Sequence, residues 1–189
     1  PSTRAVVMSP MVPAFSAVPS VSDGSVVVSP PTFNGNSVSF DVTVRNLAGH
    51  KYPTGYPSRR SWLHVKVRNG SGLTVFESGA ITAAGLIDGN DNDADPLRYE
   101  PHYAKIDAPG QVQIYEAILA DSNGRPTTGL LSAVSYLKDN RLLPRGFDKA
   151  SASPEIGVYG TAADDPDFAD GGDRVRYDLP LPEQLGAYQ

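Results

Sequence analysis

The chain contains no cysteine in its 189 residues, so it has no disulfide, no thiolate metal ligand and no cysteine nucleophile. It also lacks the Cys-x-x-Cys-His motif, which excludes covalent attachment of haem to this chain. No run of 18 or more apolar residues is present, so the sequence predicts no membrane-spanning helix. The first ten residues lack the apolar core of a signal peptide.

Signatures of common enzymes are also missing. The chain has no Gly-x-Ser-x-Gly elbow, no phosphate-binding glycine loop and no His-Glu-x-x-His motif. Its formal net charge is −5, whereas a protein that binds nucleic acid usually shows a basic stripe. We therefore expect a protein that is not an enzyme and that binds no nucleic acid.

What the chain does have is short stretches of alternating apolar and polar residues, together with 18 glycines and 17 prolines. Alternation of period two is typical of half-buried strands, and no long segment of helical period competes with it. The clearest apolar sets are Val38, Phe40, Val42 and Val44, then Leu63, Val65 and Val67. Further strands are expected at 25–29, 73–77, 112–119, 131–137, 156–159 and 174–179. Seven or eight such strands predict an all-β fold: an antiparallel β-sandwich, immunoglobulin/fibronectin-III-like, with long loops.

The domain organisation follows from composition. Residues 1–23 are rich in Pro, Ser, Val and Ala without clear periodicity, which indicates an extended linker or arm. Residues 24–189 are expected to form one β-sandwich domain, a length that buries a substantial core. Because Pro1 is not an initiator methionine, we expect this chain to be a fragment of a longer protein.

One loop stands out between two expected strands. Residues 46–61 contain His50, two prolines, two glycines and the Arg59-Arg60 pair. Binding residues are often carried on loops that a rigid scaffold positions. This loop is therefore the first candidate for a functional site.

Two segments carry a resemblance to a known family. They are Gly49-His-Lys-Tyr-Pro-Thr-Gly-Tyr-Pro-Ser-Arg-Arg60 and Tyr136-Leu-Lys-Asp-Asn-Arg-Leu-Leu-Pro-Arg-Gly-Phe-Asp-Lys149. Together with shorter matches between residues 37 and 177, they resemble the cysteine-free β-sandwich portion of secreted bacterial multihaem c-type cytochromes. The resemblance implies extracytoplasmic electron transfer, in the periplasm, at the cell surface or in the medium. Haem c would then be held by a partner chain or domain.

The histidines are the candidate haem ligands, because imidazole is a good axial ligand for iron. The resemblance implies that His50 is the distal ligand of a neighbour's haem, whereas the residues alone favour a surface histidine that is hydrogen-bonded to its own loop. His102, between Glu100 and Tyr103, is the second candidate; its alternative is a packed histidine bonded to Glu100 or to a carbonyl. His64 lies on the polar face of a strand and needs no function.

A small basic spot surrounds His50 on an otherwise acidic chain. Lys51, Arg59 and Arg60 are candidates for contact with haem propionates, since guanidinium binds carboxylate in a bidentate way. Tyr52 is a candidate for contact with the partner. The alternative is that these residues pair with the Asp-rich loops of the same chain.

An acidic loop at 88–95 offers oxygen ligands for Ca²⁺. Its first spacings match a calcium loop, but Asp93 stands where an EF-hand needs glycine, and Tyr99 stands where it needs glutamate. A looser cage is expected from Asp88, Asn90, Asp91, Asp93 and Glu100. The alternative is a solvated acidic loop.

Two functions of different class result. The first is a non-catalytic domain of, or subunit beside, a multihaem c-type cytochrome, which supplies a distal histidine and packs against the haem-bearing part. The second is a calcium-stabilised adhesive or carbohydrate-binding β-sandwich.

Overall fold

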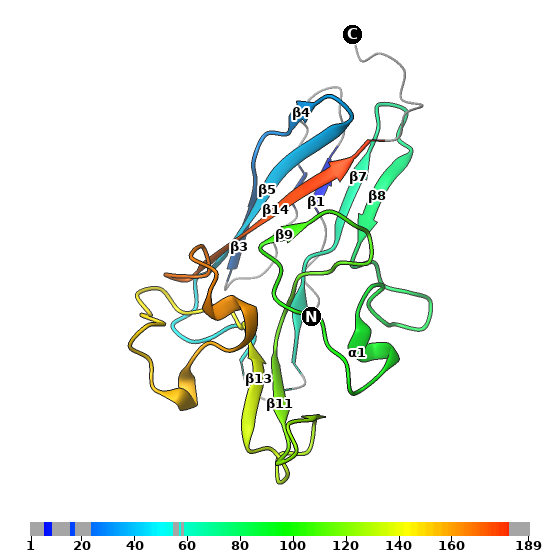
Figure 1. The fold of residues 1–189 in the computed structure, drawn as a ribbon. Helices are drawn as coiled ribbons and strands as arrows, with labels where there is room; N and C mark the ends of the chain where they lie inside the picture. Colours follow the sequence, from blue (N-terminus) through cyan, green and yellow to red (C-terminus); the bar gives the residue numbers. More distant parts are fainter. Residues whose placement is uncertain (1–5, 9–15, 18–23, 55–56, 58, 182–189) are drawn as a thin grey trace.

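The computed structural model describes residues 6–8, 16–17, 24–54, 57 and 59–181 (Figure 1). Strands dominate these residues, and the only helices described are α1 (Asp91–Ala94) and two single 3₁₀ turns, η1 (Pro154–Ile156) and η2 (Gly160–Ala163). None of the described helices is long and apolar enough to cross a membrane. The all-β class expected from the sequence is confirmed, whereas the immunoglobulin-like arrangement stays a prediction.

The largest sheet is built around two long antiparallel strands. Strand β5 (Ser37–Asn46) pairs with β14 (Gly172–Pro180) over nine residues, and β3 (Gly24–Val28) and β4 (Thr32–Asn34) pair with the other edge of β5. Strand β9 (Lys105–Ile106) adds in parallel to β14. Alternate residues of β5 are buried, as the period of two predicts, and they include Val38, Phe40, Val42 and Val44.

A second sheet packs on the inner face of the first. It contains β7 (Val65–Arg68) and β8 (Thr74–Ser78), with β1 (Val6–Met8) paired in parallel to β7 and β2 (Ser16–Ala17) beside β1. Phe40 on β5 and Tyr177 on β14 stack with ring centroids 5.1 Å apart, and Phe76 on β8 meets Tyr177 edge-on. The two sheets therefore share one apolar core.

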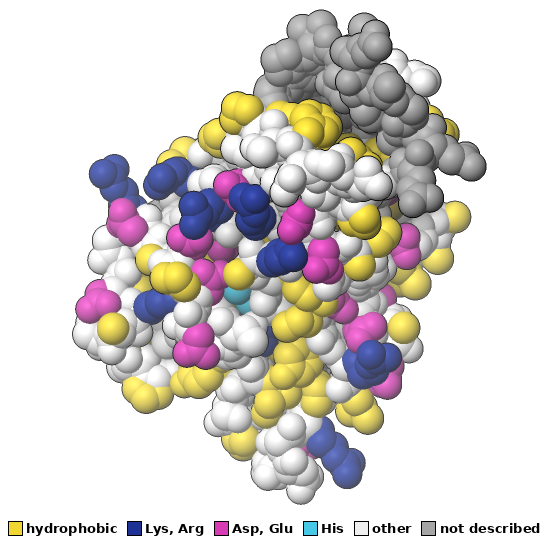
Figure 2. Space-filling view, turned by 45° about the horizontal axis from the view of Figure 1, so that its top comes forward, with side chains coloured by type: hydrophobic (Ala, Val, Ile, Leu, Met, Phe, Trp, Pro, Cys, Tyr) yellow, Lys and Arg dark blue, Asp and Glu magenta, His cyan; other side chains and the backbone are white. Residues whose placement is uncertain are grey.

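The other end of the molecule carries two smaller sheets and the long loops (Figure 1). Strand β10 (Ile114–Tyr115) pairs with β6 (Ser61–Trp62), and β11 (Ala117–Ala120) lies between β12 (Pro126–Thr127) and β13 (Ser135–Asp139). Figure 2 shows acidic and basic side chains intermixed on the visible face, with an apolar strip running toward this end. Most of the polar interior described below lies between these small sheets and the start of β14.

Several sequence expectations differ from the structure. The strand expected at 112–119 is interrupted at Glu116, and only the second half of 131–137 becomes β13. Of residues 156–159, Ile156 ends the 3₁₀ turn η1 and Tyr159 forms a single bridge with Asp139. The expected arm at 1–23 lies mostly outside the described residues, and its described parts are β1 and β2. A run of apolar residues does not specify whether neighbouring strands are available, which explains these differences.

Candidate functional site

The His50 loop is fixed by an amide at the end of β5. Asn46 is 3% exposed, and its Nδ2 donates to the carbonyl of His50 at 2.7 Å and to those of Leu142 and Leu143 at 3.1 Å. Its Oδ1 accepts from the backbone N–H of Ala48 at 2.9 Å. One buried side chain thus joins the loop to a segment about a hundred residues later in the chain.

Lys51 fixes the other side of the loop by turning inward. Its Nζ donates to Asp139 Oδ2 at 2.8 Å and to the carbonyl of Gly157 at 2.7 Å, and only 11% of its side chain is exposed. Burial lowers the pKa of Lys51, although the Asp139 carboxylate acts in the opposite direction. Tyr52 pairs its backbone with Leu142 and packs on the apolar core. The sequence expectation that Lys51 and Tyr52 face a partner therefore does not fit their positions.

His50 itself is exposed at the surface of this braced loop. Its Nδ1 lies 3.1 Å from the carbonyl oxygen of Lys51. Because a carbonyl only accepts, Nδ1 carries the proton in this contact, and Nε2 of the neutral ring keeps its lone pair. Within the described residues Nε2 has no hydrogen-bond partner. This is the arrangement in which metal-bound histidines are held, with one ring N–H on a carbonyl and the other nitrogen free to bind.

The arginine pair is divided between two environments. Arg60 Nη2 pairs with Asp93 Oδ1 at 2.5 Å, so its charge is already balanced inside the chain. Arg59 is exposed, and within the described residues it donates only to the carbonyl of Thr54, at 3.2 Å. Of the four residues expected to contact haem propionates or the partner, Arg59 is the one whose position fits.

His102 lies in the interior, with 1% of its side chain exposed. Its Nδ1 accepts from Gln113 Nε2 at 2.7 Å and Asn140 Nδ2 at 3.1 Å, while its Nε2 faces Asp165 Oδ2 at 3.1 Å. A neighbour's haem iron would have no access to either ring nitrogen. The expectation that His102 is an axial ligand therefore does not fit the structure. The alternative of a packed histidine does, but its partners are Asp165, Gln113 and Asn140 and not the expected Glu100 or a carbonyl.

The tautomer of His102 is set by its two amide neighbours. Gln113 Oε1 accepts the backbone N–H of Tyr103 at 2.8 Å, and Asn140 Oδ1 accepts that of Glu116 at 3.0 Å. If either amide flipped, its NH₂ group would face a backbone N–H, which is also a donor. Both amides therefore direct their NH₂ groups at Nδ1 of His102. The ring proton is thus on Nε2, and burial lowers the pKa of His102 despite the nearby carboxylates.

The donor atoms of His102, Asp165 and Asp173 lie within 4.8 Å of one another, a spacing that suits a metal ion. Asp173 Oδ1 is buried without a hydrogen bond and lies 3.6 Å from His102 Nε2. However, a metal-bound histidine donates from its other nitrogen, whereas Nδ1 of His102 accepts from two amides. The cluster therefore fits a ring proton shared between two carboxylates better than it fits a metal.

The acidic loop forms short-range contacts in place of the expected calcium cage. Asp93 accepts the N–H of Ile87, Asp91 pairs with Arg98 at 2.6 Å, and Glu100 accepts from the Tyr103 hydroxyl. Asn90 caps α1 through Oδ1, and Asp88 is exposed. Among the described residues, the carboxylates of this loop do not converge as the three donors around His102 do.

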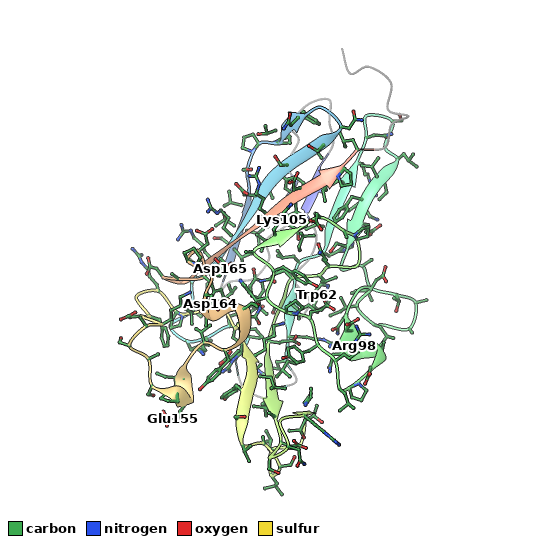
Figure 3. The ribbon with its side chains drawn as sticks, viewed as in Figure 1. Trp62, Arg98, Lys105, Glu155, Asp164 and Asp165 are labelled. Carbon is green, nitrogen blue, oxygen red and sulfur yellow. The ribbon has the colours of Figure 1, made fainter. Side chains whose placement is uncertain are left out.

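A second acidic stretch, at residues 164–173, lies away from this loop. Figure 3 labels Asp164 and Asp165 on the opposite side of the ribbon from Arg98 and α1. Asp165 instead belongs to the interior around His102. The calcium expectation therefore gains no additional ligand from this stretch.

Sequence reasoning missed most of the polar interior. Lys138, with 1% of its side chain exposed, pairs with Glu116 at 2.9 Å, and Tyr115 donates to Asp173 at 2.6 Å. The only signal in the sequence was the strongly polar Lys138-Asp-Asn-Arg141 run next to apolar residues.

His64 pairs with Glu77 at 2.8 Å on the partly exposed face of β7 and β8, which agrees with a structural residue.

No family model, curated protein or solved structure matches this chain, so its interpretation relies on the geometry of these residues.

Proposed function

We propose that this chain is a non-catalytic domain of, or a subunit beside, an extracytoplasmic multihaem c-type cytochrome. In this role it supplies His50 as the distal axial ligand of a haem c held by the partner. The observation that carries the proposal is the Nδ1 contact of His50 with the Lys51 carbonyl, which leaves the exposed Nε2 with its lone pair.

The bracing of the loop supports this role. The Asn46 amide and the Lys51 ammonium hold the backbone on either side of His50 through partly buried contacts. A ligand held in this way loses little conformational freedom when it binds, which favours affinity. When bound to iron, an imidazole nitrogen completes six-coordination and influences the reduction potential of the haem.

The surroundings of His50 also suit a docking surface. Leu47 is 65% exposed in the same loop, and Arg59 makes one hydrogen bond to the part of the chain that the structure describes. An apolar contact next to an exposed guanidinium fits a haem edge with its propionates. Electrons would pass through the partner's haem, and the residues of this chain would hold and shield it.

The first test uses a soluble haem c peptide whose iron has one histidine ligand and one open axial position. Adding the chain is expected to convert the iron from high spin to low spin, followed by absorption and electron paramagnetic resonance. His50→Ala should abolish the conversion. His64→Ala is the matched control, because it removes a histidine that is paired with Glu77, and it should leave the conversion intact.

The second test uses the natively purified particle that contains this chain. A bis-histidine low-spin signal that becomes partly high-spin in the His50→Ala particle would support the proposal. Native material without c-type haem would refute it. Haem that is indifferent to the substitution would reduce His50 to a loop residue.

A further inference from the structure

A second feature lies outside the His50 loop: a pocket of about 440 Å³ between β11, β12 and the segment after α1. Pockets of this size commonly take small molecules. The lining residues used below are Arg60, Glu116, Leu97, Ile118 and Leu119. His50 is not among the lining residues.

Arg60 presents unused donors to this pocket. Its Nη2 is bound to Asp93, and this is its one hydrogen bond within the described part of the chain. About a quarter of the side chain is exposed. Since a guanidinium has five N–H donors in a planar fork, Arg60 can receive a carboxylate without giving up Asp93.

Glu116 presents a carboxylate oxygen, a hydrogen-bond acceptor, to the same pocket. Its Oε1 pairs with Lys138, and its Oε2 has no partner among the described residues. In the described part of the chain, the fully buried side-chain atoms without a partner are Asn90 Nδ2, Asp173 Oδ1 and the Tyr177 hydroxyl. Oε2 of Glu116 is not one of them, so it is not fully buried. Glu116 lines the pocket, and 5% of its side chain is exposed.

Part of the remaining wall is apolar and open to water, while Asn92, Thr127 and Thr128 add polar groups. Leu97 is 57% exposed at the pocket, although a leucine gains free energy when it is covered. Ile118 and Leu119 add apolar surface from β11. A ligand with an apolar part would cover this surface.

Charge balance narrows the class of ligand. Both Arg60 and Glu116 are already in ion pairs, with Asp93 and Lys138, so the two pairs together carry no net charge. A ligand with only a negative charge would leave Oε2 of Glu116 without a partner, and a ligand with only a positive charge would leave the remaining donors of Arg60 without one. A ligand with one charge of each sign satisfies both.

We propose that this pocket binds a small zwitterion, an α-amino acid with an apolar side chain. Its carboxylate meets the guanidinium of Arg60, its ammonium meets Oε2 of Glu116, and its side chain covers Leu97 and Ile118. The proposal is independent of haem binding, because the two sites use different residues.

The test is titration of the 189-residue chain with L-leucine, followed by isothermal calorimetry and by saturation-transfer NMR. We expect saturable one-to-one binding. N-acetyl-L-leucine lacks the ammonium and L-leucinamide lacks the carboxylate, and each should bind at least about tenfold more weakly, as loss of one charged hydrogen bond predicts.

Three variants localise the binding. Glu116→Gln keeps the shape of the side chain and should weaken L-leucine binding at least about tenfold. Ile118→Trp fills the pocket and should abolish binding in a chain whose circular dichroism is unchanged. Arg59→Ala removes the neighbouring exposed arginine and should bind as the wild type does.

The proposal is overturned if L-leucine shows no saturable binding, if it binds the Ile118→Trp chain as well as the wild type, or if N-acetyl-L-leucine binds equally well. None of these results would affect the conversion of the haem peptide by His50.

Discussion

Lys51 Nζ and Asp139 Oδ2 lie 2.8 Å apart although 88 residues separate them in the chain. Asp139, 1% exposed, also accepts from Arg141 Nε and Nη2 at 2.8 Å. The carboxylate thus joins the loop that presents His50 to the segment that follows β13. The charges of Lys51 and Arg141 are both balanced by this one buried carboxylate.

Asp139→Ala is therefore expected to be strongly destabilising. It leaves the charges of Lys51 and Arg141 partly buried without a counter-charge, which should cost about 3–5 kcal/mol in the free energy of unfolding. Urea denaturation measures the change. Asp107→Ala removes a half-exposed partner of Lys105 and should cost at most about 1 kcal/mol. Equal effects of the two substitutions would contradict the role given to Asp139.

The pH dependence of stability should report on His102. Its folded-state pKa is lowered by burial, so below the ordinary value of about 6.5 the unfolded chain binds a proton that the folded chain excludes. The free energy of unfolding should fall as the pH falls below 6.5, by up to about 1.4 kcal/mol per pH unit. Above that pH the contribution is fully present.

Asp173 acts with the opposite sign. Burial raises its pKa, so the folded chain binds a proton between that raised value and about pH 3.8, where the unfolded carboxylate is ionised.

Urea unfolding from pH 7 to pH 5 should give a shallower slope for His102→Asn than for the wild type. If the variant does not fold, ¹⁵N NMR of the wild type should show a neutral Nε2–H ring at pH 6. Protonation on both nitrogens at that pH would refute the tautomer assignment.

Gly79 tests a close approach of backbone to backbone. Its φ is +73°, and a Cβ there would meet the Leu63 carbonyl oxygen and approach Trp62 and Val112 at 3.1 Å. Gly79→Ala should destabilise by about 3 kcal/mol, since strain of the left-handed backbone and the clash add. Gly72 has φ of +82° with open space around it, so Gly72→Ala isolates the backbone strain at about 1 kcal/mol. Similar midpoints in thermal unfolding would count against the clash.

The Lys138–Glu116 pair lends itself to a double-mutant cycle. Lys138→Met removes the ammonium that also donates to the Ile114 carbonyl, and it leaves Glu116 charged in the interior. We expect a loss of about 3–5 kcal/mol. Adding Glu116→Gln removes the uncompensated charge and should recover at least about 1 kcal/mol of it. Strictly additive losses would show that the two side chains do not interact.

Much of the apolar framework could be predicted from local pattern. The burial of Val38, Phe40, Val42 and Val44 follows from the period of a strand, because alternate side chains must point to one face. The Asn34-Gly35 pair also indicates a hairpin turn in the sequence. In the structure Asn34 ends β4 and the two turn residues are Gly35 and Asn36, with Gly35 at a positive φ of 56°. These features depend only on neighbours within a few residues.

The direction of the charged side chains could not be predicted in the same way. From the sequence, Lys51 and Lys138 are expected at the surface, since lysine is rarely buried without a partner. Their partners, Asp139 and Glu116, are 88 and 22 residues away in the chain. Only the folded arrangement brings such groups close enough for an ion pair to offset the loss of hydration.

The sequence by itself determined the all-β class, the faces of the longest strands and the presence of an exposed loop at His50, because each depends on local period and turn chemistry. Tertiary structure decided that Lys51 and Tyr52 face inward, that His102 is enclosed, and that the acidic loop pairs with Arg60 and Arg98. The physical reason is that a charge or ring nitrogen is satisfied by whichever partner the fold brings within about 3 Å, and sequence spacing does not contain that information.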